Sequence, residues 1–364
     1  MPQAKLSILV TGVGGRSVGH QILHGLLLMG SKYRVVACDA DSFAYGLYEV
    51  PDRYQIPRAD SQSYLDTILS IVEREKIDVI LPGTEPEVFV LAGAAPTLHD
   101  RGCTVVVNPR SVVQLCSNKA TLYEWLSANG FGVPKSAPLS AWSSLTATCG
   151  FPLVAKPTTM TGGSKGVALL NSEEEVARYV EALSPNVEVI FQEYIDGPES
   201  EYTVGVMISK SGELIDSIVM HRRLVGMSLG VERVITNKHY ALSTGYSQGY
   251  IIRDAFIQSE CEQLAMRIGA RGPMNIQCRV NDGELFVFEV HPRFSGTSSF
   301  RADVGFNEPD TLIRNFHFDE QFVRIPYQTD VAAIRAFSNI VVPLEKMAAT
   351  PQAVAPTGEL CRSR

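Results

Sequence analysis

Several features that mark particular classes of protein are missing from this sequence of 364 residues. Its seven cysteines form no C-x-x-C pair and no cluster with histidine at zinc-finger spacing, so we expect reduced thiols rather than disulfides or a zinc site. No apolar run is long enough to span a bilayer, and no apolar core with a cleavage site follows the N-terminus. These absences predict a cytoplasmic protein with no membrane partner.

Positive charge is also scarce, because 32 Lys and Arg residues stand against 39 Asp and Glu residues and leave a net charge of -7. A dedicated nucleic-acid-binding protein would carry a basic face, so no nucleic-acid partner is expected, although small anions can still be bound locally. What is present is the composition of a globular protein, 45% hydrophobic and 20% charged. A chain of this length suits about two or three packed units.

Strand and helix patterns alternate along the first 110 residues. Short apolar strands separated by helices are predicted at residues 6–10, 33–38, 77–81 and 103–107. This order predicts a parallel doubly wound sheet. The loop from Gly12 to Ser17 is a degenerate dinucleotide fingerprint, and Asp39 stands about where a ribose-binding carboxylate would be. An NAD-type oxidoreductase is therefore one hypothesis, and a tight turn that brings a helix close to the sheet is the alternative.

From Asn118 onward the pattern changes, and two lysines stand at positions suited to phosphate. Lys119 opens a helix, and Lys156 ends an apolar strand directly before a loop that contains Gly162, Gly163, Ser164 and Gly166. A fixed positive charge beside glycine backbone N–H groups suits phosphate oxygens. The loop is not a Walker A motif, and an ordinary hairpin loop is the alternative.

Two further segments offer groups that suit a nucleoside. The next predicted strand ends in Gln192, Glu193, Tyr194 and Ile195, whose backbone groups could hold an adenine. Glu201 begins the following strand and could accept hydrogen bonds from ribose hydroxyls. The alternatives are that residues 192–195 form a strand end without a function and that Glu201 is a solvated residue at the edge of a sheet.

The stretch richest in polar chemistry is a predicted hairpin between Gly272 and Thr297. Glu289, His291 and Arg293 occupy alternate positions at the end of its second strand, so we expect them on one face. A carboxylate in an otherwise apolar strand needs a partner, because burying it alone is costly. Either Mg²⁺ or a salt bridge to a nearby arginine would supply that partner.

Gln277, on the first strand of this hairpin, can join Glu289 only if the pairing is irregular. With a strict two-residue turn at Asp282-Gly283, Gln277 would oppose Phe288 and face away from Glu289. A shared site therefore requires an odd loop or a β-bulge.

Taken in order, these segments resemble the ATP-grasp ligases, and especially the synthetase halves of the carbamoyl-phosphate synthase large chain. The resemblance rests on Lys119, on Lys156 with its glycine loop, on QEYIDGPESEYTV and on NIQCRV...FVFEVHPRFSG, and it covers about residues 5–316. It implies an α/β chain in which an N-terminal Rossmann-like sheet domain precedes an ATP-grasp fold, whose two α+β subdomains clasp ATP. The implied limits are 1–110 for the sheet domain, 111–316 for the ATP-grasp domain with a lid at about 134–195, and 317–364 for a C-terminal strand and loose tail. The sequence pattern predicts that last strand from Asp330 to Val342.

The resemblance also implies how ATP would be bound. Lys119 and Lys156 would contact its phosphates, and the loop from Gly162 to Gly166 would cover them. The segment from Gln192 to Ile195 would line the adenine, and Glu201 would bind the ribose.

Further implied roles concern metal and phosphoryl transfer. Glu289 would bridge two Mg²⁺ ions, with Gln277 and His291 as further ligands, and Arg293 would contact the transferred phosphoryl group. His291 stands where the family usually has Asn, and imidazole is a poorer Mg²⁺ ligand than a carbonyl oxygen. Either His291 contacts phosphate or substrate instead, or the site accepts Mn²⁺.

The reaction implied is ATP-dependent ligation, in which a small carboxylate becomes an acyl phosphate that an amine then attacks. Such chemistry needs positioning and charge neutralisation, with Lys156 and Arg293 as the catalytic residues, and no protein nucleophile. Candidates for substrate contact are Arg222, Arg223, Ser295 and Arg301, although surface or capping roles are alternatives.

Two other hypotheses remain beside the ligase. One is the NAD-type oxidoreductase, and the other is an ATP-grasp fold that binds nucleotide without catalysis, which only His291 favours. A glutaminase partner is conceivable by analogy, but the chain carries one copy of the synthetase motifs, so a stand-alone enzyme, with a homodimer as the default, is preferred.

Overall fold

The computed structural model describes residues 5–15, 17–159, 166–184 and 186–348, and it divides into two compact units. Unit 1 takes its described residues from the ranges 1–110, 293–323 and 337–364. Unit 2 comprises Ser111–Pro292 and Arg324–Ala336. The domain limits implied by the resemblance stay predictions, and residues 293–316, expected in the ATP-grasp domain, cluster with unit 1.

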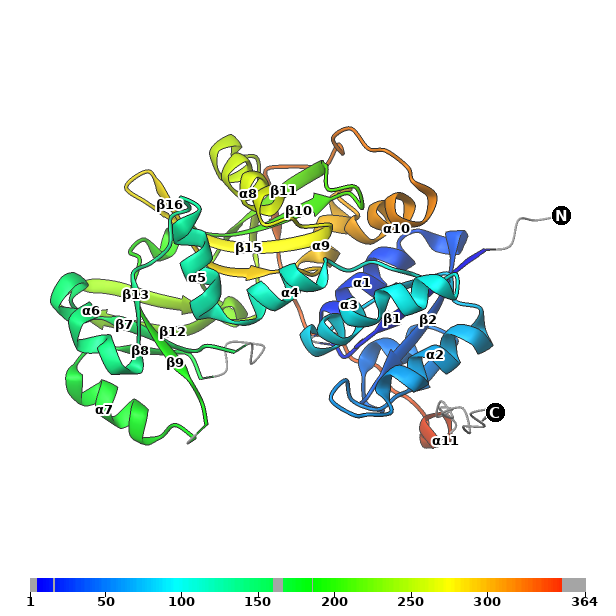
Figure 1. Ribbon diagram of the computed structural model, residues 1–364, viewed down its shortest axis with the longest axis horizontal. Coiled ribbons are helices and arrows are strands. Elements are labelled where there is room, and N and C mark those ends of the chain that lie inside the picture. The colour runs from blue at the N-terminus through cyan, green and yellow to red at the C-terminus, as the bar shows by residue number, and fades with distance from the viewer. Residues whose placement is uncertain (1–4, 16, 160–165, 185, 349–364) are drawn as a thin grey trace, which may run out of the picture. The chain divides into compact units, whose positions relative to one another are not determined.

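Unit 1 is built on a five-stranded sheet in the order β3-β2-β1-β4-β5, and every pairing in it is parallel. Its strands are β1 (Leu6–Thr11), β2 (Tyr33–Asp39), β3 (Asp52–Gln55), β4 (Val79–Leu81) and β5 (Thr104–Val105). Its helices are α1 (Val18–Leu27), α2 (Tyr64–Glu75), α3 (Glu85–Asp100), α9 (Ser298–Asp303), α10 (Glu308–Phe318) and α11 (Leu344–Ala348) (Figure 1). The predicted parallel sheet is confirmed, and only β3, which lacks an apolar run, escaped the sequence pattern.

Gly19, in the first turn of α1, allows this helix to pack closely against the end of β1. A Cβ on Gly19 would lie 2.3 Å from the carbonyl oxygens of both Thr11 and Gly12, so only glycine lets the helix approach the strand this closely. The Asp39 carboxylate accepts hydrogen bonds from the backbone N–H groups of Gly14 and Asp41, each at 2.9 Å. These contacts match the tight-turn interpretation of the loop.

Unit 2 is built on a six-stranded sheet in the order β16-β15-β10-β11-β14-β17, with antiparallel pairing throughout. The strands are β10 (Glu201–Ile208), β11 (Leu214–Arg222), β14 (Gly249–Ile252), β15 (Gly272–Asn281), β16 (Glu284–His291) and β17 (Val331–Ala333). Helices α5 (Lys119–Ala128) and α8 (Ala255–Arg267) share its apolar core, and α4 (Arg110–Ser117) leads into α5 (Figure 1).

A smaller sheet in unit 2 has the order β6-β9-β7-β8 and falls within residues 134–195, for which a lid stays a prediction. Its elements are β6 (Ser136–Pro138), α6 (Trp142–Cys149), β7 (Leu153–Pro157), β8 (Ala168–Leu170), α7 (Glu173–Glu181) and β9 (Val189–Glu193). A hairpin of β12 (Leu229–Ile235) and β13 (Lys238–Ser243) packs on it through a small apolar cluster and through an ion pair between Arg233 and Glu175 at 2.7 Å. Gly162, Gly163 and Ser164 lie outside the described residues.

The strand predicted from Asp330 to Val342 is wrong in extent. Only β17, three residues long, pairs with β14, and residues 334–343 have no regular structure. The apolar residues there produced a strand-like pattern in the sequence, although many of them face solvent, as Val341 does at 95% exposure.

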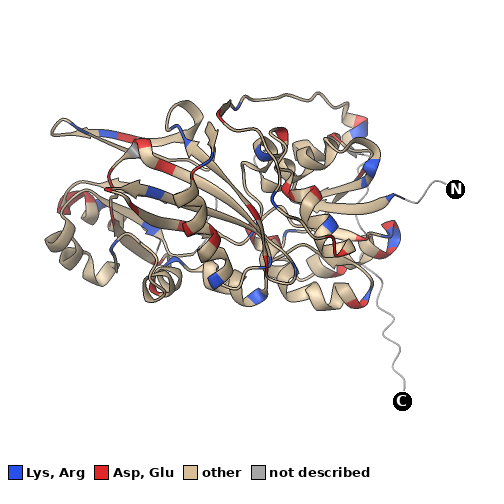
Figure 2. Cartoon of the chain, turned by 90° about the horizontal axis from the view of Figure 1, so that it is seen from above, with Lys and Arg blue, Asp and Glu red and all other residues tan. Residues whose placement is uncertain are grey.

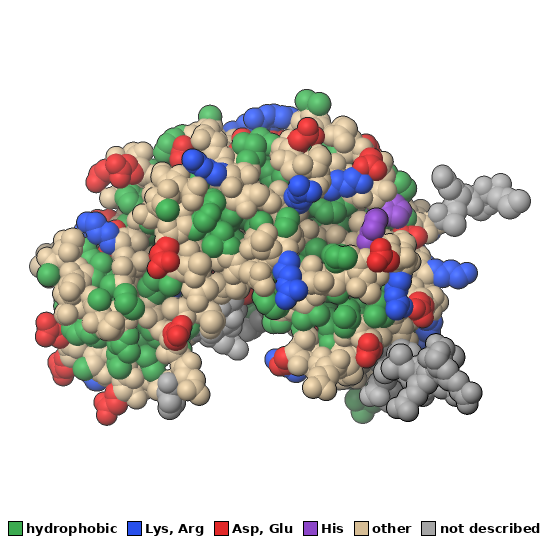
Figure 3. All heavy atoms as spheres, viewed as in Figure 1, with side chains coloured by type: hydrophobic (Ala, Val, Ile, Leu, Met, Phe, Trp, Pro, Cys, Tyr) green, Lys and Arg blue, Asp and Glu red, His purple; other side chains and the backbone are tan. Residues whose placement is uncertain are grey.

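Charges of both signs are interspersed along the chain in the view of Figure 2. On the face seen in Figure 3, apolar side chains form small areas between charged ones. Among the residues that the structure describes, no helix combines the length and the hydropathy needed to cross a membrane. The six cysteines within the described ranges are free thiols.

Candidate active site

The hairpin of β15 and β16 turns tightly and then becomes irregular. Asp282 and Gly283 have φ values of 50° and 80°, the left-handed values that a two-residue hairpin turn uses. Pairing is regular as far as Cys278 and Val287, and then the register shifts so that Gln277 opposes Glu289. A β-bulge, one of the two arrangements that a shared site required, is therefore present.

The bulge changes which side chains face the core. Val287 and Val290 are each 1% exposed and belong to the apolar core, whereas Phe288 and Glu289 between them are both partly exposed. The Gln277 amide Nε2 donates to Glu289 Oε2 at 2.9 Å, and His291 Nε2 lies 3.2 Å from the same oxygen. The structure thus brings together the three residues predicted to hold metal.

Glu289 is ionised in this setting. Burial by itself would raise its pKa, but the charge and hydrogen bond of His291, together with the charges of Lys119 and Lys156, lower the pKa to about 2. A carboxylate that is anionic at neutral pH is the kind of oxygen ligand that Mg²⁺ prefers.

Lys119 and Lys156 are both held near this carboxylate. Lys119 is the first residue of α5, where the Asn118 side chain caps the helix by accepting from Ala120 N at 2.9 Å. Lys156 is the penultimate residue of β7, and its Nζ donates to Gln192 Oε1 at 2.8 Å and lies 5.1 Å from the centre of the Phe288 ring. Burial lowers the pKa of Lys156 to about 8, against the attraction of Glu289.

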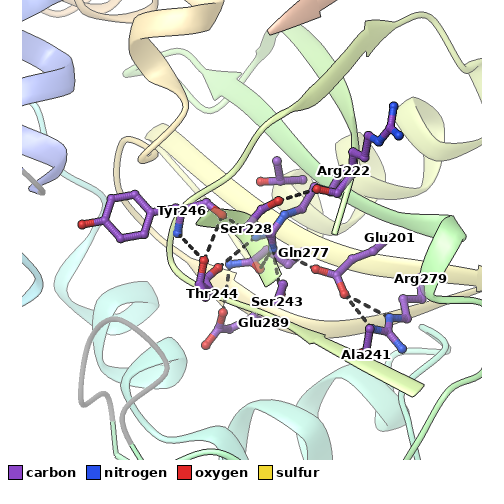
Figure 4. A network of polar contacts seen from close by, with 12 residues as sticks. Glu201, Arg222, Ser228, Ala241, Ser243, Thr244, Tyr246, Gln277, Arg279 and Glu289 are labelled. Atoms are coloured by element: carbon purple, nitrogen blue, oxygen red, sulfur yellow. Dashed lines mark hydrogen bonds and ion pairs between the residues drawn. The ribbon is translucent and has the colours of Figure 1, made fainter. Parts of the chain in front are cut away.

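A buried ion-pair network joins β10, β11 and β15 (Figure 4). Glu201 Oε1 accepts from Arg222 Nη1 at 2.8 Å, and Glu201 Oε2 accepts from Arg279 Nη2 at 2.9 Å. Burial would raise the pKa of Glu201, but the two guanidinium charges outweigh it and lower the pKa. Both oxygens of Glu201 therefore serve ion pairs inside unit 2, which is a structural role beside the predicted contact with ribose.

Arg222 is likewise used inside the unit, since its side chain is only 1% exposed. Its Nη2 donates to the carbonyl oxygens of Thr244 at 2.9 Å and Tyr246 at 3.1 Å. These bonds connect the segment after β13 to the six-stranded sheet. The neighbouring Arg223 is exposed and donates to the Tyr250 hydroxyl at 3.1 Å. Of the two arginines, Arg223 is the one with solvent access.

Gln277 bridges Arg222 and Glu289. Its Oε1 accepts from Arg222 Nη1 at 3.1 Å while its Nε2 donates to Glu289, so the amide oxygen faces a guanidinium rather than an open ligand position. Among the described residues, no group of three or more His, Cys, Asp or Glu side chains could hold a metal. The donor set fits a Mg²⁺ ion held by one carboxylate and mainly by nucleotide phosphates.

The segment predicted to line adenine is partly engaged by the protein. Glu193 Oε1 accepts from Lys135 N at 2.6 Å, and the Ile195 carbonyl accepts from Arg279 Nη1 at 2.8 Å. The Tyr194 ring lies over the Arg279 guanidinium, with 4.9 Å between the ring centre and Cζ. These contacts fix the backbone that leaves β9.

Three other predicted residues belong to unit 1. Arg293 Nη2 pairs with Glu85 Oε1 at 2.7 Å. Arg301 is fully buried and pairs with Glu308 at 2.7 Å. The Ser295 hydroxyl lies 2.8 Å from that of Thr297. Arg301 therefore has a structural partner of its own, and its contact with substrate stays a prediction.

Sequence reasoning missed two residues, Tyr123 in unit 2 and Glu85 in unit 1. Tyr123, on α5, donates its hydroxyl to the Phe288 carbonyl at 2.7 Å, and Glu85 holds Arg293. Nothing in the local sequence marks either contact, because the partners are more than a hundred residues apart.

Family models match both parts of the chain. The PylC-like N-terminal domain model matches residues 8–106, and the ATP-grasp domain model matches residues 116–297. The carbamoyl phosphate synthase large chain of Vibrio cholerae is 26% identical over 317 residues, which are 82% of this chain and 28% of the relative. That of Deinococcus radiodurans is 25% identical over 246 residues, 65% of this chain and 22% of the relative. The chain thus spans about a quarter of the length of these curated relatives.

Solved structures show the same fold. N5-carboxyaminoimidazole synthetase from Staphylococcus aureus aligns with a TM-score of 0.62 at 17% identity, covering 89% of this chain and 81% of that one. L-amino acid ligase from Bacillus licheniformis aligns with a TM-score of 0.61 at 16% identity, covering 86% and 74%. The predicted ATP-grasp fold is confirmed. Since the ATP-grasp model alone matches half of the residues, the chain belongs to the ATP-grasp family.

Proposed function

We propose that the chain is an ATP-dependent ligase that activates a small carboxylate as an acyl phosphate, which an amine then attacks to form a carbon–nitrogen bond with release of ADP and phosphate. The observation that carries the proposal is the gathering of two lysines and an ionised carboxylate, Lys119, Lys156 and Glu289, within one unit of an ATP-grasp chain. The names of two structural neighbours, a carboxyaminoimidazole synthetase and an amino acid ligase, support ligation of this kind.

In the proposed site, the charge of each residue decides which part of the nucleotide or which ion it binds. Lys119 and Lys156 bind the phosphate oxygens, and Glu289 holds the cation that accompanies them, so the charge that develops during phosphoryl transfer is neutralised by fixed groups. Mg²⁺, when bound, would supply positive charge at the position where Glu289 holds it. Arg293 contacts the transferred phosphoryl group, and the residues from Gln192 to Ile195 with Glu201 hold the nucleoside. Mn²⁺ is an alternative ion, because His291 offers an imidazole.

The substrates are a small carboxylate and an amine, and their identities are left to experiment. Arg223, the exposed member of the arginine pair, is the better candidate for a substrate carboxylate. A cytoplasmic location and a homodimer belong to the same proposal.

An ATP-binding module without catalysis is the second candidate, and His291 beside Glu289 is the observation that favours it. The oxidoreductase hypothesis has weaker support, because the Asp39 carboxylate already accepts two backbone hydrogen bonds from Gly14 and Asp41. These protein contacts use two of the about four acceptor positions of the carboxylate that would have to bind ribose.

Turnover with pooled substrates tests the proposal. The protein is incubated with ATP, Mg²⁺ and pools of amino acids or small carboxylates, and ADP and phosphate are measured. We expect at least one pool to raise ADP release, and Glu289→Gln to lower that release by about 100-fold or more, as the loss of several kcal/mol of charge stabilisation predicts. Glu284→Gln, an exposed carboxylate on the same strand, is the matched control and should stay near wild type.

Two outcomes would contradict the ligase. Background ADP release with every pool, while ATP still binds, favours the binding module. A fluorescence change on adding NAD, without any response to ATP, favours the oxidoreductase.

A further inference from the structure

The bulge in β16 leaves one residue outside the strand ladder. Phe288 has no partner on β15, because Cys278 pairs with Val287 and Gln277 pairs with Glu289. A bulge residue leaves ladder groups unpaired, and a backbone carbonyl that loses its partner without replacement destabilises the fold. The carbonyl of Phe288 therefore needs a donor from elsewhere.

That donor is the hydroxyl of Tyr123, at 2.7 Å from the Phe288 oxygen. Tyr123 lies on α5, is 3% exposed and packs in the apolar core of the six-stranded sheet. The buried ring therefore holds the hydroxyl in place. One residue earlier, Val287 N donates to the Gly132 carbonyl at 2.8 Å. Helix α5 and the segment that follows it thus contact β16 at the bulge residue and at the residue just before it.

Both side chains at the bulge face the candidate site. The Phe288 ring lies 5.1 Å from Lys156 Nζ, and Glu289 accepts from Gln277. Without the extra residue in the ladder, Gln277 would oppose Phe288, and Glu289 would turn toward the core, because a one-residue slip exchanges the two faces of a strand. The bulge therefore decides whether the lysine and the carboxylate meet.

We propose that Tyr123 is a positioning residue for the site: through the carbonyl of Phe288 it holds the bulge that keeps Glu289 opposite Gln277 and Phe288 beside Lys156. The inference rests on the proposed function, since it assigns how the metal-binding carboxylate of that site is held. In the proposed site Tyr123 itself touches neither the nucleotide nor the metal.

The test is Tyr123→Phe, which removes one oxygen and keeps the ring. We expect the Mg²⁺ concentration for half-maximal ADP release to rise about tenfold, the effect of losing one hydrogen bond of ordinary strength, while ATP affinity without Mg²⁺ changes less than about threefold. Tyr327→Phe is the matched control, because the Tyr327 hydroxyl also donates to a backbone carbonyl of unit 2, that of Ser217 at 3.3 Å. It should leave both quantities near wild type.

Hydrogen exchange separates this inference from the proposed function. In the free protein, amides of residues 284–291 should exchange faster in Tyr123→Phe than in wild type or Tyr327→Phe. If the wild type neither turns over nor binds ATP, the ligase proposal fails and exchange alone decides the role of Tyr123. Unchanged exchange together with an unchanged Mg²⁺ requirement, where turnover is measurable, overturns the inference.

Deleting Phe288 supplies a second variant. The deletion removes the bulge yet keeps Glu289 opposite Gln277 in regular pairing, so adding Tyr123→Phe should cause no further change in exchange or Mg²⁺ requirement. If Tyr123→Phe alone does not fold, the combined variant should fold, and its failure to fold would count against the inference.

Discussion

At the scale of the residue, the surroundings of Lys156 change its pKa, and this change has consequences that can be measured. Its ammonium group donates to Gln192 and lies near the ring of Phe288. Burial lowers its pKa from 10.5 to about 8, and the charge of Lys119 acts in the same direction. The folded protein therefore releases this proton at a lower pH than the unfolded chain does. Between about pH 8 and 10.5 the unfolded chain binds more protons, so the Lys156 contribution to stability rises with pH in that window.

The same shift predicts the pH dependence of activity. The ratio kcat/KM for ATP reports the free enzyme, so it should fall above about pH 8 as the Lys156 ammonium loses its proton. In Lys156→Arg the falling limb should move to higher pH, since a guanidinium stays charged. Lys135→Arg, at an exposed lysine, is the control and should keep the wild-type profile. A wild-type profile that stays level well above pH 8 would argue against a role for the ammonium.

At the scale of the element, the edge strand β16 is covered by residues 131–133 rather than by another strand. A Cβ on Gly132 would lie 2.2 Å from the Leu285 carbonyl oxygen, so this close contact requires glycine. Covering an edge in this way pairs one of its backbone groups and prevents further strands from adding to the sheet.

Gly132→Ala should therefore disturb the hairpin that carries Glu289. We expect a loss of about 1–3 kcal/mol in the free energy of unfolding, as for other overpacked sites, together with faster amide exchange in residues 284–291. Gly130→Ala is the control: its φ of 81° makes alanine strained, but nothing lies within 4 Å of the added Cβ. It should lower stability by about 1 kcal/mol and leave exchange in β16 unchanged. Equal exchange in both variants would contradict the prediction.

At the scale of the whole molecule, two units carry different predicted residues. The lysines and Glu289 belong to unit 2, whereas Arg293, Ser295 and Arg301 belong to unit 1. A chain with two compact units need not unfold in one step, and a ligand that binds the native state stabilises the part it contacts.

Calorimetry with nucleotide tests this division. Mg²⁺ and ATP at about 100 times the dissociation constant should stabilise unit 2 by about 2.7 kcal/mol and move its unfolding transition upward. Because Glu289 holds the cation in the proposed site, Glu289→Gln should lose the part of the shift that disappears with EDTA. Glu284→Gln should keep it. An EDTA-sensitive shift of wild-type size in Glu289→Gln would place the ion elsewhere.

Local patterns in the sequence determined much of this protein. Apolar strands alternating with helices predicted the parallel sheet of unit 1, and the order of Lys119, Lys156 and the Glu289 strand predicted the ATP-grasp fold. The sheet prediction succeeds because strand and helix patterns are read within a few residues of each position. The ATP-grasp prediction succeeds because the motifs occur in the order found in a known family. The same local reasoning extended the C-terminal strand to Val342, since an apolar run alone does not show whether a neighbouring strand is there to pair with it.

Only the tertiary structure decided how the site is assembled. Glu201 joins Arg279 across 78 positions of sequence, and Tyr123 reaches Phe288 across 165. A site shared by Gln277 and Glu289 required a bulge or an odd turn, and the structure has the bulge, where a hydroxyl from α5 donates to the unpaired carbonyl of Phe288. The physical reason is that burying a polar group requires a partner, and which partner arrives depends on how distant elements pack.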